Sequence, residues 1–254
     1  MAKVFITGAS SGIGAALAAH YARDGAVLGL CARRLAATQA LLSSLGSDGT
    51  CYQADVTDAR ALQTAAADFT ERFGVPDIVI ANAGIGAGTL TEKPEDLAVF
   101  RRIMDTNVLG MVTTFQPFVA PMRERGSGTL VGIASVAGFR GLPGGGAYSA
   151  SKSAAITYLE SLRVELHGSG VSVVTICPGY IHTPMTAGNR YPMPFLIDAD
   201  DAARRIARVI ASRRRFAVIP WRMALVSVVL RWVPRWLYDR LFAQAPRKAR
   251  GLTQ

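Results

Sequence analysis

A tyrosine and a lysine in the second half of the chain have the residue types and spacing of a proton-transfer pair. Tyr148 and Lys152 stand four residues apart in the segment Gly-Ala-Tyr-Ser-Ala-Ser-Lys. On a helix, residues i and i+4 lie on the same face, so the lysine ammonium can approach the phenol. A phenol ionises near pH ~10, and a neighbouring cation favours its ionised form. We therefore expect Tyr148 to donate or accept a proton near neutral pH.

A glycine-rich turn near the N-terminus has the composition of a phosphate-binding loop. Gly8, Gly12 and Gly14 follow the strand-like run Val4–Ile6 and open a segment with helical periodicity. Glycines permit a tight turn and let the backbone approach a diphosphate, whose charge suits a helix N-terminus. Taken alone, these glycines could also form an ordinary strand-to-helix turn. Together with Tyr148, they indicate hydride-transfer chemistry on a bound dinucleotide.

These groups must be positioned by alternating strands and helices. Apolar runs bounded by Gly, Pro and Asn alternate with longer segments of helical periodicity. The predicted strands are Val4–Ile6, Val27–Cys31, Cys51–Gln53, Ile78–Ile80, Thr129–Ile133, Val171–Ile176 and Phe216–Ile219. The predicted helices are Ile13–Arg23, Ala59–Phe73, Pro94–Arg125 (as two helices), Tyr148–His167 and Ala199–Ser212. The succession predicts an α/β fold, a doubly wound, Rossmann-like parallel sheet of about seven strands flanked by helices, plus C-terminal helices.

The chain has no repeat, low-complexity tract or long linker, and its 254 residues are typical of one α/β domain. We expect residues 1–220 to form a single dinucleotide-binding catalytic domain, with residues 221–254 as a C-terminal helical extension of it.

The three cysteines lie in or beside apolar runs without metal-ligand spacing. They suggest reduced thiols in a cytoplasmic protein, and we expect no metal site. The N-terminus is already strand-like, with no secretory leader ahead of it, which favours the same location.

Further motifs follow the glycine-rich turn in an order typical of a known family. They are Asn82-Ala83-Gly84, Ser135 and Tyr148-x-x-x-Lys152, joined by Asp55, Asn107, Pro178-Gly179 and Thr183. Over roughly residues 3–220 the chain therefore resembles the short-chain dehydrogenase/reductase family. The motifs are specific for the family but not for a substrate.

The resemblance implies a four-residue catalytic site. Ser135 would hold the substrate carbonyl, and Tyr148 would pass the proton while the cofactor passes the hydride. Lys152 would lower the pKa of Tyr148 and contact the nicotinamide ribose. Asn107 would help to hold a water that links Lys152 to solvent. His182 is a competing acid/base, but its position between two cofactor contacts suggests a side chain that points away or lines the pocket.

The resemblance also implies the cofactor contacts. Asp55 and Val56 would meet the adenine, Asn82 the adjoining ribose region, and Ile181 and Thr183 the nicotinamide carboxamide. The complete set is Gly8, Ser10, Ser11, Gly12, Ile13, Gly14, Arg33, Asp55, Val56, Asn82, Ala83, Gly84, Tyr148, Lys152, Pro178, Gly179, Ile181 and Thr183. Relatives often have a second asparagine where this chain has Ala81. We expect this difference to have little effect on cofactor binding.

The end of the second predicted strand favours NADP(H) over NAD(H). Relatives that prefer NAD usually carry an acid at the position of Ala32, and here Arg33 follows instead. A guanidinium suits a phosphate, so Arg33 is expected to bind the extra phosphate of NADP. The alternative is that Arg33 and Arg34 are simply solvated on a loop.

The segment after the sixth predicted strand suggests an apolar substrate. Met185, Tyr191, Met193 and Phe195 would form a deformable wall, with Phe139 and Leu142 near the entrance. The same side chains could instead pack a lid onto the body. Arg190 could anchor an acidic group.

The expected function is NADP(H)-dependent interconversion of a carbonyl and an alcohol on an apolar small molecule, by a homodimer or homotetramer as the resemblance implies. The alternative is a noncatalytic dinucleotide-binding sensor or scaffold.

The C-terminal fifth carries the excess positive charge. Residues 204–254 hold 13 of the 28 Lys and Arg but one acid, Asp239. The apolar run Met223–Leu230 is too short to span a bilayer, which needs about 20 residues. Together with tryptophans and flanking arginines, it resembles helices lying at a membrane interface, so residues 221–245 could make a peripheral membrane contact. The alternative is packing on the lid or on a second subunit. Nucleic acid is an unlikely partner because no recognition motif accompanies the charge.

Overall fold

A parallel sheet forms the centre of the computed structural model, which describes residues 1–189 and 191–251. Its seven strands stand in the order β3-β2-β1-β4-β5-β6-β9, and each neighbouring pair is parallel. The strands are β1 Lys3–Thr7, β2 Val27–Ala32, β3 Gly49–Gln53, β4 Ile78–Ala81, β5 Gly128–Ile133, β6 Val171–Pro178 and β9 Phe216–Ile219. The strand order reverses between β1 and β4, and sheets of this kind bind ligands at the carboxyl ends beside such a switch point.

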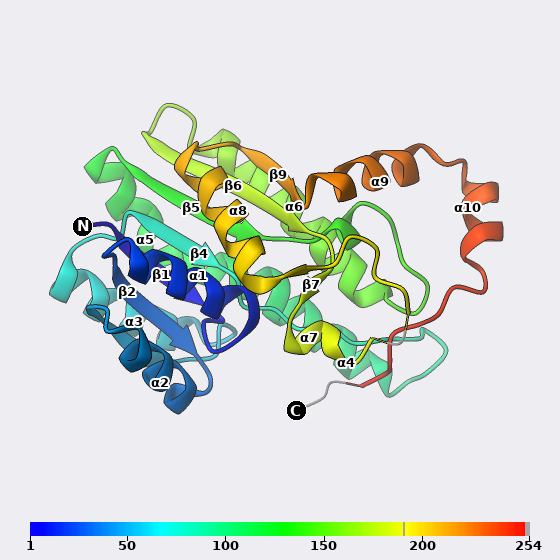
Figure 1. Ribbon diagram of the computed structural model, residues 1–254, viewed down its shortest axis with the longest axis horizontal. Helices are drawn as coiled ribbons and strands as arrows, with labels where there is room; N and C mark the ends of the chain where they lie inside the picture. The colour runs from blue at the N-terminus through cyan, green and yellow to red at the C-terminus, as the bar shows by residue number, and fades with distance from the viewer. Residues whose placement is uncertain (190, 252–254) are drawn as a thin grey trace.

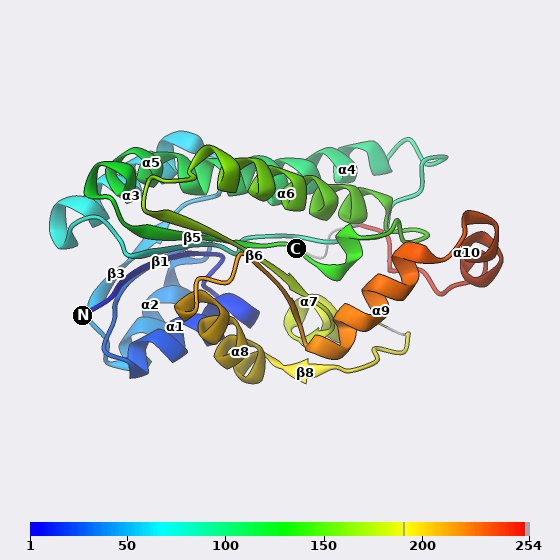
Figure 2. The same ribbon diagram turned by 90° about the horizontal axis from the view of Figure 1, so that it is seen from above.

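Helices cover both faces of the sheet, which confirms the predicted doubly wound fold (Figure 2). One face carries α1 Gly12–Arg23, α2 Leu35–Leu45 and α8 Ala199–Ala211. The other carries α3 Ala59–Phe73, α5 Gly110–Arg125 and α6 Gly146–Glu165. Because both faces are covered, the central strands are largely buried and apolar rather than alternating, whereas the edge strand β3 is only partly buried and ends in the exposed Gln53.

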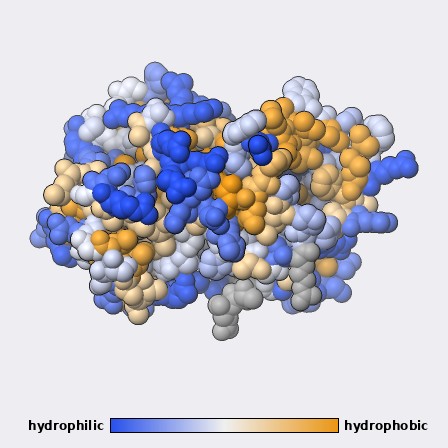
Figure 3. All heavy atoms as spheres, viewed as in Figure 1, coloured by the Kyte–Doolittle hydropathy of each residue, from blue (hydrophilic) through white to orange (hydrophobic). Residues whose placement is uncertain are grey.

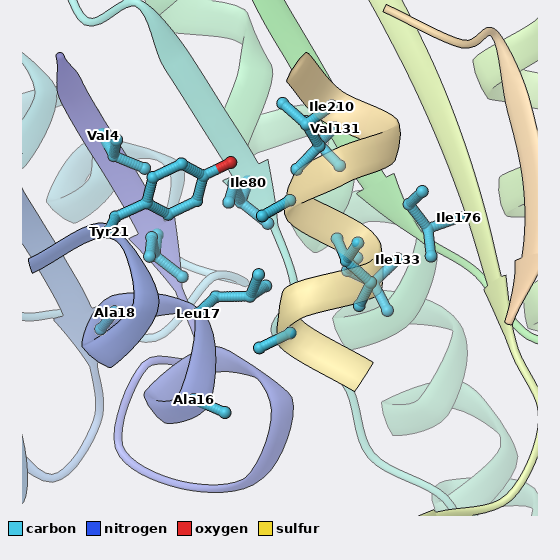
Figure 4. Close-up of a cluster of buried hydrophobic side chains, with 14 of the residues drawn as sticks. Val4, Ala16, Leu17, Ala18, Tyr21, Ile80, Val131, Ile133, Ile176 and Ile210 are labelled. Atoms are coloured by element: carbon cyan, nitrogen blue, oxygen red, sulfur yellow. The ribbon is translucent and has the colours of Figure 1, made fainter. Parts of the chain in front are cut away.

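Two apolar cores hold these layers together. In the first, Leu17 of α1 and Ile210 of α8 meet Ile80 and Ile133 of the sheet (Figure 4). The second is rich in aromatic rings: the Phe5 ring centre lies 5.6 Å from that of Phe69 and 5.0 Å from that of Phe118. The two cores fix the strands from both sides, so the strand ends present a rigid platform to the site.

Several elements differ from the sequence prediction. Helix α2 was not predicted, and Thr38 is its one fully buried residue, so its apolar periodicity is weak. The expected pair of helices over 94–125 is α4 Asp96–Met104 and α5, joined through a π-helical segment, η1 Asp105–Leu109. Short elements follow other strands: η2 Val136–Gly138, β7 Ile181–His182, α7 Pro184–Ala187 and β8 Ile197–Asp198.

The predicted C-terminal helices are α9 Trp221–Trp232 and α10 Arg235–Phe242. They leave β9 and extend beyond one end of the sheet (Figure 1). Their inner side packs on the body: Tyr238 is buried and its hydroxyl donates to the carbonyl of Gly141 at 2.7 Å, while the Arg140 guanidinium lies 4.2 Å from the Tyr238 ring centre. Among the described residues, no helix is both long and apolar enough to cross a bilayer.

Candidate active site

The glycine-rich turn after β1 is built as a close-packed backbone cradle. Gly8 and Gly12 have φ values of 68° and 58°, in the left-handed region that favours glycine. A β carbon on Gly14 would lie 2.6 Å from the amide nitrogen of Asn82. That amide donates to the carbonyls of Thr7 and Gly8, both at 3.1 Å. Asn82, expected at the ribose region, therefore also braces the turn.

The segment after β6 lies opposite the glycine-rich turn. A β carbon on Gly12 would lie 3.2 Å from the Thr183 methyl group, so the turn and this segment face each other closely. Thr186 holds Thr183 in place: its hydroxyl accepts from the Thr183 N–H at 3.1 Å and donates to the Ile181 carbonyl at 2.6 Å. The turn presents backbone without β carbons at Gly8, Gly12 and Gly14 where α1 begins, which suits a diphosphate at a helix N-terminus. Ser10, Ser11 and Ile13 belong to the same turn, and Pro178 and Gly179 end β6 on the opposite side.

Two arginines follow β2 and lie near the glycine-rich turn and the end of β3. The Nη2 atom of Arg34 donates to the Ser10 hydroxyl at 3.1 Å. The Nη1 atom of Arg33 lies 4.0 Å from Oδ2 of Asp55. The predicted Arg33 thus has a neighbour, Arg34, which was not among the predicted cofactor contacts and which contacts the glycine-rich turn. The two guanidinium groups come from adjacent positions after β2 and have different partners, Ser10 for Arg34 and Asp55 for Arg33.

The residues predicted to meet the adenine, Asp55 and Val56, follow β3. Oδ1 of Asp55 accepts from the N–H and the hydroxyl of Thr57 at 3.0 and 2.9 Å, so the carboxylate is fixed in an Asx turn. Val56 is buried, and its carbonyl accepts from the Thr113 hydroxyl at 2.6 Å. Both residues stand at the carboxyl edge of the sheet, as the resemblance implies.

Asn107 reaches the site from the π-helical segment η1, a local irregularity that often marks a functional position. Its side chain is buried. Oδ1 accepts from the Ile85 N–H at 2.8 Å, and Nδ2 donates to the Ile85 carbonyl and to the Ser151 hydroxyl, both at 2.9 Å. A β carbon on Gly84 would lie 3.2 Å from Oδ1 of Asn107 and 3.5 Å from Nζ of Lys152. Gly84, the last residue of the Asn82-Ala83-Gly84 motif, therefore lies close to both side chains.

Ser135 follows β5 and precedes the short helix η2. Its hydroxyl accepts from the Ala137 N–H at 3.1 Å, which caps that helix. The same oxygen lies 3.5 Å from the Pro178 carbonyl, to which it donates. The hydroxyl is therefore held between the ends of β5 and β6, at the carboxyl edge of the sheet.

Tyr148 and Lys152 lie on the first turns of α6 with the predicted spacing. Nζ of Lys152 is 5.8 Å from the Tyr148 ring centre and donates to the Ile133 carbonyl at 2.8 Å. Burial lowers the pKa of Lys152 to about 8. Burial also raises the pKa of Tyr148, while hydrogen bonding with Ser135 acts in the opposite direction. Burial of the phenol therefore acts against the lowering of the Tyr148 pKa that the sequence predicts.

The same chain matches known proteins over most of its length. A family model described as short chain dehydrogenase matches residues 2–193. The chain belongs to the short-chain dehydrogenase family. An uncharacterized oxidoreductase of Myxococcus xanthus is 40% identical over 237 residues, which cover 92% of this chain and 93% of that protein. The dehydrogenase/reductase SDR family member 7B of Mus musculus is 32% identical and matches 98% of this chain and 82% of its own.

Solved structures share the short-chain dehydrogenase fold. An alcohol dehydrogenase from the archaeon Thermococcus sibiricus, complexed with 5-hydroxy-NADP, superposes with a TM-score of 0.76 at 27% identity. The superposition covers 86% of this chain and 96% of that one. The chain is therefore an oxidoreductase of this family whose fold binds a nicotinamide dinucleotide.

The segment after β6, predicted to form a lid over the substrate, packs through aromatic contacts in this short-chain dehydrogenase. The ring centres of Tyr191 and Tyr180 lie 6.3 Å apart, and the Arg222 guanidinium of α9 lies 5.6 Å from the Phe195 ring centre. Phe139, expected at the entrance, lies against the last strand, with its ring centre 6.1 Å from that of Phe216. Arg190, expected as an acid anchor, lies outside the described residues. Helix α9 therefore supports the lid from outside.

Two further sequence expectations concern titratable groups. The His182 side chain is exposed and lies 3.7 Å from the Asp198 carboxylate, so it faces solvent rather than Tyr148. Cys31 and Cys177 are buried and Cys51 is half-buried, all three as free thiols. Within residues 1–189 and 191–251, no three His, Cys, Asp or Glu side chains gather in an arrangement that could hold a metal ion.

The structure adds three residues that the sequence analysis did not assign to the site. Ser151 lies between Asn107 and the Tyr148 backbone, Arg34 contacts the glycine-rich turn, and Lys248 approaches the Tyr148 ring from the C-terminus. The position of Ser151 directly before Lys152 is a local signal that could have found it. Lys248 offers no such signal, because a hundred residues separate it from the tyrosine.

Proposed function

We propose that this chain is an NADP(H)-dependent oxidoreductase that interconverts a carbonyl and an alcohol on an apolar small molecule. The observation that carries the proposal is the meeting of Asn107, Ser135, Tyr148 and Lys152 at one edge of the sheet, beside a glycine-rich backbone cradle. Lys152 lies within 5.8 Å of the Tyr148 ring centre, and the Ser135 hydroxyl is held at the end of the neighbouring strand. When bound, the nicotinamide would supply or accept the hydride.

The four side chains have separate tasks in this proposal. The Ser135 hydroxyl orients the substrate oxygen, and the Tyr148 hydroxyl gives that oxygen a proton during reduction or takes it during oxidation. The Lys152 ammonium favours the phenolate that is left after the transfer, since opposite charges attract strongly in a partly buried site. Asn107 holds the backbone of Ile85 and the Ser151 hydroxyl, which keeps the wall of the cleft in place.

The preference for NADP rests on the two arginines at the end of β2. Ala32 leaves no acid there to repel a phosphate, and Arg33 and Arg34 extend on either side of the opening. A planar guanidinium binds phosphate oxygens through paired hydrogen bonds. Arg34 is already directed at Ser10 in the diphosphate turn, so the pair could bind the 2′-phosphate from two sides.

The proposed substrate class follows from the lid. Its aromatic rings and methionines, together with the half-buried ring of Tyr148, offer an adaptable apolar surface. A ketone, an aldehyde or a secondary alcohol with an apolar body would suit such a wall.

The direct test is to follow NADPH oxidation with a panel of apolar ketones and aldehydes, using wild type and Tyr148→Phe. We expect turnover by the wild type and a loss of more than about a thousandfold in Tyr148→Phe, since the proton donor is removed. Cofactor binding, measured by calorimetry, should remain within a few-fold in the variant. Full activity of Tyr148→Phe would require a different proton donor.

A noncatalytic dinucleotide-binding scaffold would keep the cradle but would have no need of the Tyr148–Lys152 pair. The same panel separates the two functions, because a scaffold would bind NADPH and reduce none of the carbonyls.

We also propose that residues 1–220 act as the catalytic domain of a cytoplasmic homodimer or homotetramer and that 221–254 extend that domain. Exposed Leu97, Phe100 and Leu109, on α4 and η1, support an interface between subunits.

The outer side of α9 and α10 supports a peripheral membrane contact through residues 221–245. Apolar side chains gather over these helices (Figure 3). Trp221, Leu225 and Trp232 recur at helical spacing on the outer side of α9, and Trp232 is 81% exposed. Flanking arginines would complement an anionic lipid surface. Nucleic acid is not part of the proposal, because the apolar side of these helices has no role in binding phosphates.

A further inference from the structure

The C-terminal segment returns from α10 to the mouth of the active site, where it forms a strap of residues 244–251 (Figure 1). The strap is joined to the segment after β4: the Gly88 N–H donates to the Ala249 carbonyl at 2.8 Å, and Gly88 and Arg250 form a parallel bridge. A β carbon on Gly88 would collide with the Lys248 carbonyl oxygen. This approach of two backbones is possible because Gly88 has no side chain.

Arg250 ties the strap to the start of α4. Its Nε and Nη2 atoms donate to the two carboxylate oxygens of Asp96 at 2.9 and 3.1 Å, and Nη2 also donates to Glu95 at 2.6 Å. Asp96 is a buried carboxylate that also accepts from the Leu90 N–H at 2.8 Å. Such a two-pronged pair fixes direction as well as distance. The strap is therefore anchored two residues beyond Lys248.

The anchored strap places the Lys248 ammonium beside the proposed proton donor. Nζ of Lys248 lies 6.0 Å from the Tyr148 ring centre, and a β carbon on Gly86 would be 3.4 Å from it. Its hydrogen-bond partner is the Met185 carbonyl of α7, at 3.4 Å. Lys248 thus lies between the segment after β4 and helix α7, beside Tyr148.

We propose that Lys248 binds an anionic group, a carboxylate or a phosphate, at one end of the substrate while the substrate carbonyl lies at Tyr148. The inference rests on the proposed function and narrows its substrate class to apolar carbonyl compounds that carry an anion.

The charge balance around Lys248 supports this assignment. Among residues 1–189 and 191–251, no carboxylate lies within 4.0 Å of its ammonium, whereas the neighbouring Arg250 has two acidic partners. Burial lowers the pKa of Lys248, which reflects a cation partly removed from water without compensation by an acid. Binding an anion would supply the missing counter-charge.

The test uses full-length protein and methyl-ketone carboxylates of increasing chain length, each paired with its methyl ester and with a phosphonate of matched length. The variants are Lys248→Met, Lys248→Arg and, as a control, Lys93→Met on the nearby exposed loop. For the carboxylate of best-fitting length, we expect Lys248→Met to raise KM about tenfold or more and to change KM for the ester less than twofold. Lys248→Arg should restore most of the preference, and Lys93→Met should match wild type. The phosphonate arm shows which anion is preferred.

Equal effects of Lys248→Met on acid and ester would overturn the inference and would instead indicate a general role beside Tyr148. If the wild type reduced none of the ketones, the proposed reductase activity would fail separately. Calorimetric binding of the carboxylate in the presence of NADP would then still decide the role of Lys248. Weaker binding to Lys248→Met than to wild type supports the inference, and equal binding contradicts it.

Discussion

The side-chain amide of Asn107 donates a 2.9 Å hydrogen bond to the hydroxyl of Ser151, across 44 residues of sequence. Ser151 in turn donates to the Tyr148 carbonyl at 2.8 Å. This chain of contacts joins the π-helical segment η1 to the first turns of α6. It therefore sets the position of Tyr148 and Lys152 relative to the segment after β4, with no atom of Ser151 needed in the reaction itself.

Ser151→Ala should lower both stability and turnover. The buried Asn107 amide would lose an acceptor, which costs about 1–3 kcal/mol of unfolding free energy. A small displacement of the reacting groups should lower kcat about tenfold. Urea unfolding and steady-state kinetics measure the two effects. Ser153→Ala is the matched control, since Ser153 is an exposed neighbour on the same helix. A destabilised variant with unchanged kcat would limit Ser151 to a structural role.

The depressed pKa of Lys152 predicts how activity depends on pH. Because burial lowers the pKa to about 8, the ammonium is lost as the pH rises through that value. We expect the rate of carbonyl reduction to fall above about pH 8. Lys152→Arg keeps its charge, so any activity that it retains should not fall in this range. A wild-type profile that stays flat from pH 7 to 10 would contradict a requirement for the charged lysine.

The same pKa shift predicts a stability difference between wild type and Lys152→Met. Below pH 8 the lysine is charged in both the folded and unfolded states, so burial of the charge is fully destabilising. Between pH 8 and 10.5 the folded protein releases this proton first, so its stability rises with pH. Relative to Lys152→Met, wild type should gain up to about 3 kcal/mol over that window in denaturant titrations.

The two arginines after β2 predict a graded change in cofactor preference. Arg33→Ala and Arg34→Ala should each raise KM for NADP about tenfold and change KM for NAD less than threefold, since the loss of one charge-assisted bond to phosphate costs about 1.5 kcal/mol. The double variant should lose most of the preference. Arg60→Ala, on an exposed turn of α3, serves as the control. An unchanged preference in both single variants would remove these residues from the phosphate site.

The outer side of α9 predicts binding to anionic lipid. Co-sedimentation with vesicles containing phosphatidylserine should capture the wild type, and a Trp221→Ser, Leu225→Ser, Trp232→Ser variant should lose most of the binding. Point changes are preferable to removal of the helix, because Met223 packs on Gly179 at the end of β6. Leu97→Ser removes an equally exposed apolar side chain elsewhere. Equal partitioning of all three proteins would exclude a membrane role for this surface.

Much of the fold could be predicted from local sequence. The strand Phe216–Ile219 and the helix Ala59–Phe73 have the predicted bounds, and the other predicted strands differ by at most two residues at an end. Strands that are buried on both faces of the sheet need apolar residues at successive positions, and this gives a run of apolar residues that is visible in the local sequence. Helix α2 was missed because Thr38 is its one fully buried side chain, which left little apolar pattern to read. The π-helical segment was missed because nothing in its composition distinguishes it from the α-helix around it.

The sequence alone determined the family and the alternation of strands and helices, and it predicted the set of Asn107, Ser135, Tyr148 and Lys152, because all of these depend on motifs read in order along the chain. Only the tertiary structure decided what surrounds them. The placement of Arg34 on the diphosphate turn and the bridge from Asn107 to Ser151 depend on distances between separate elements. Most of all, Lys248 meets Tyr148 through a strap anchored by Arg250, and such a long-range contact leaves no periodicity or spacing in the sequence.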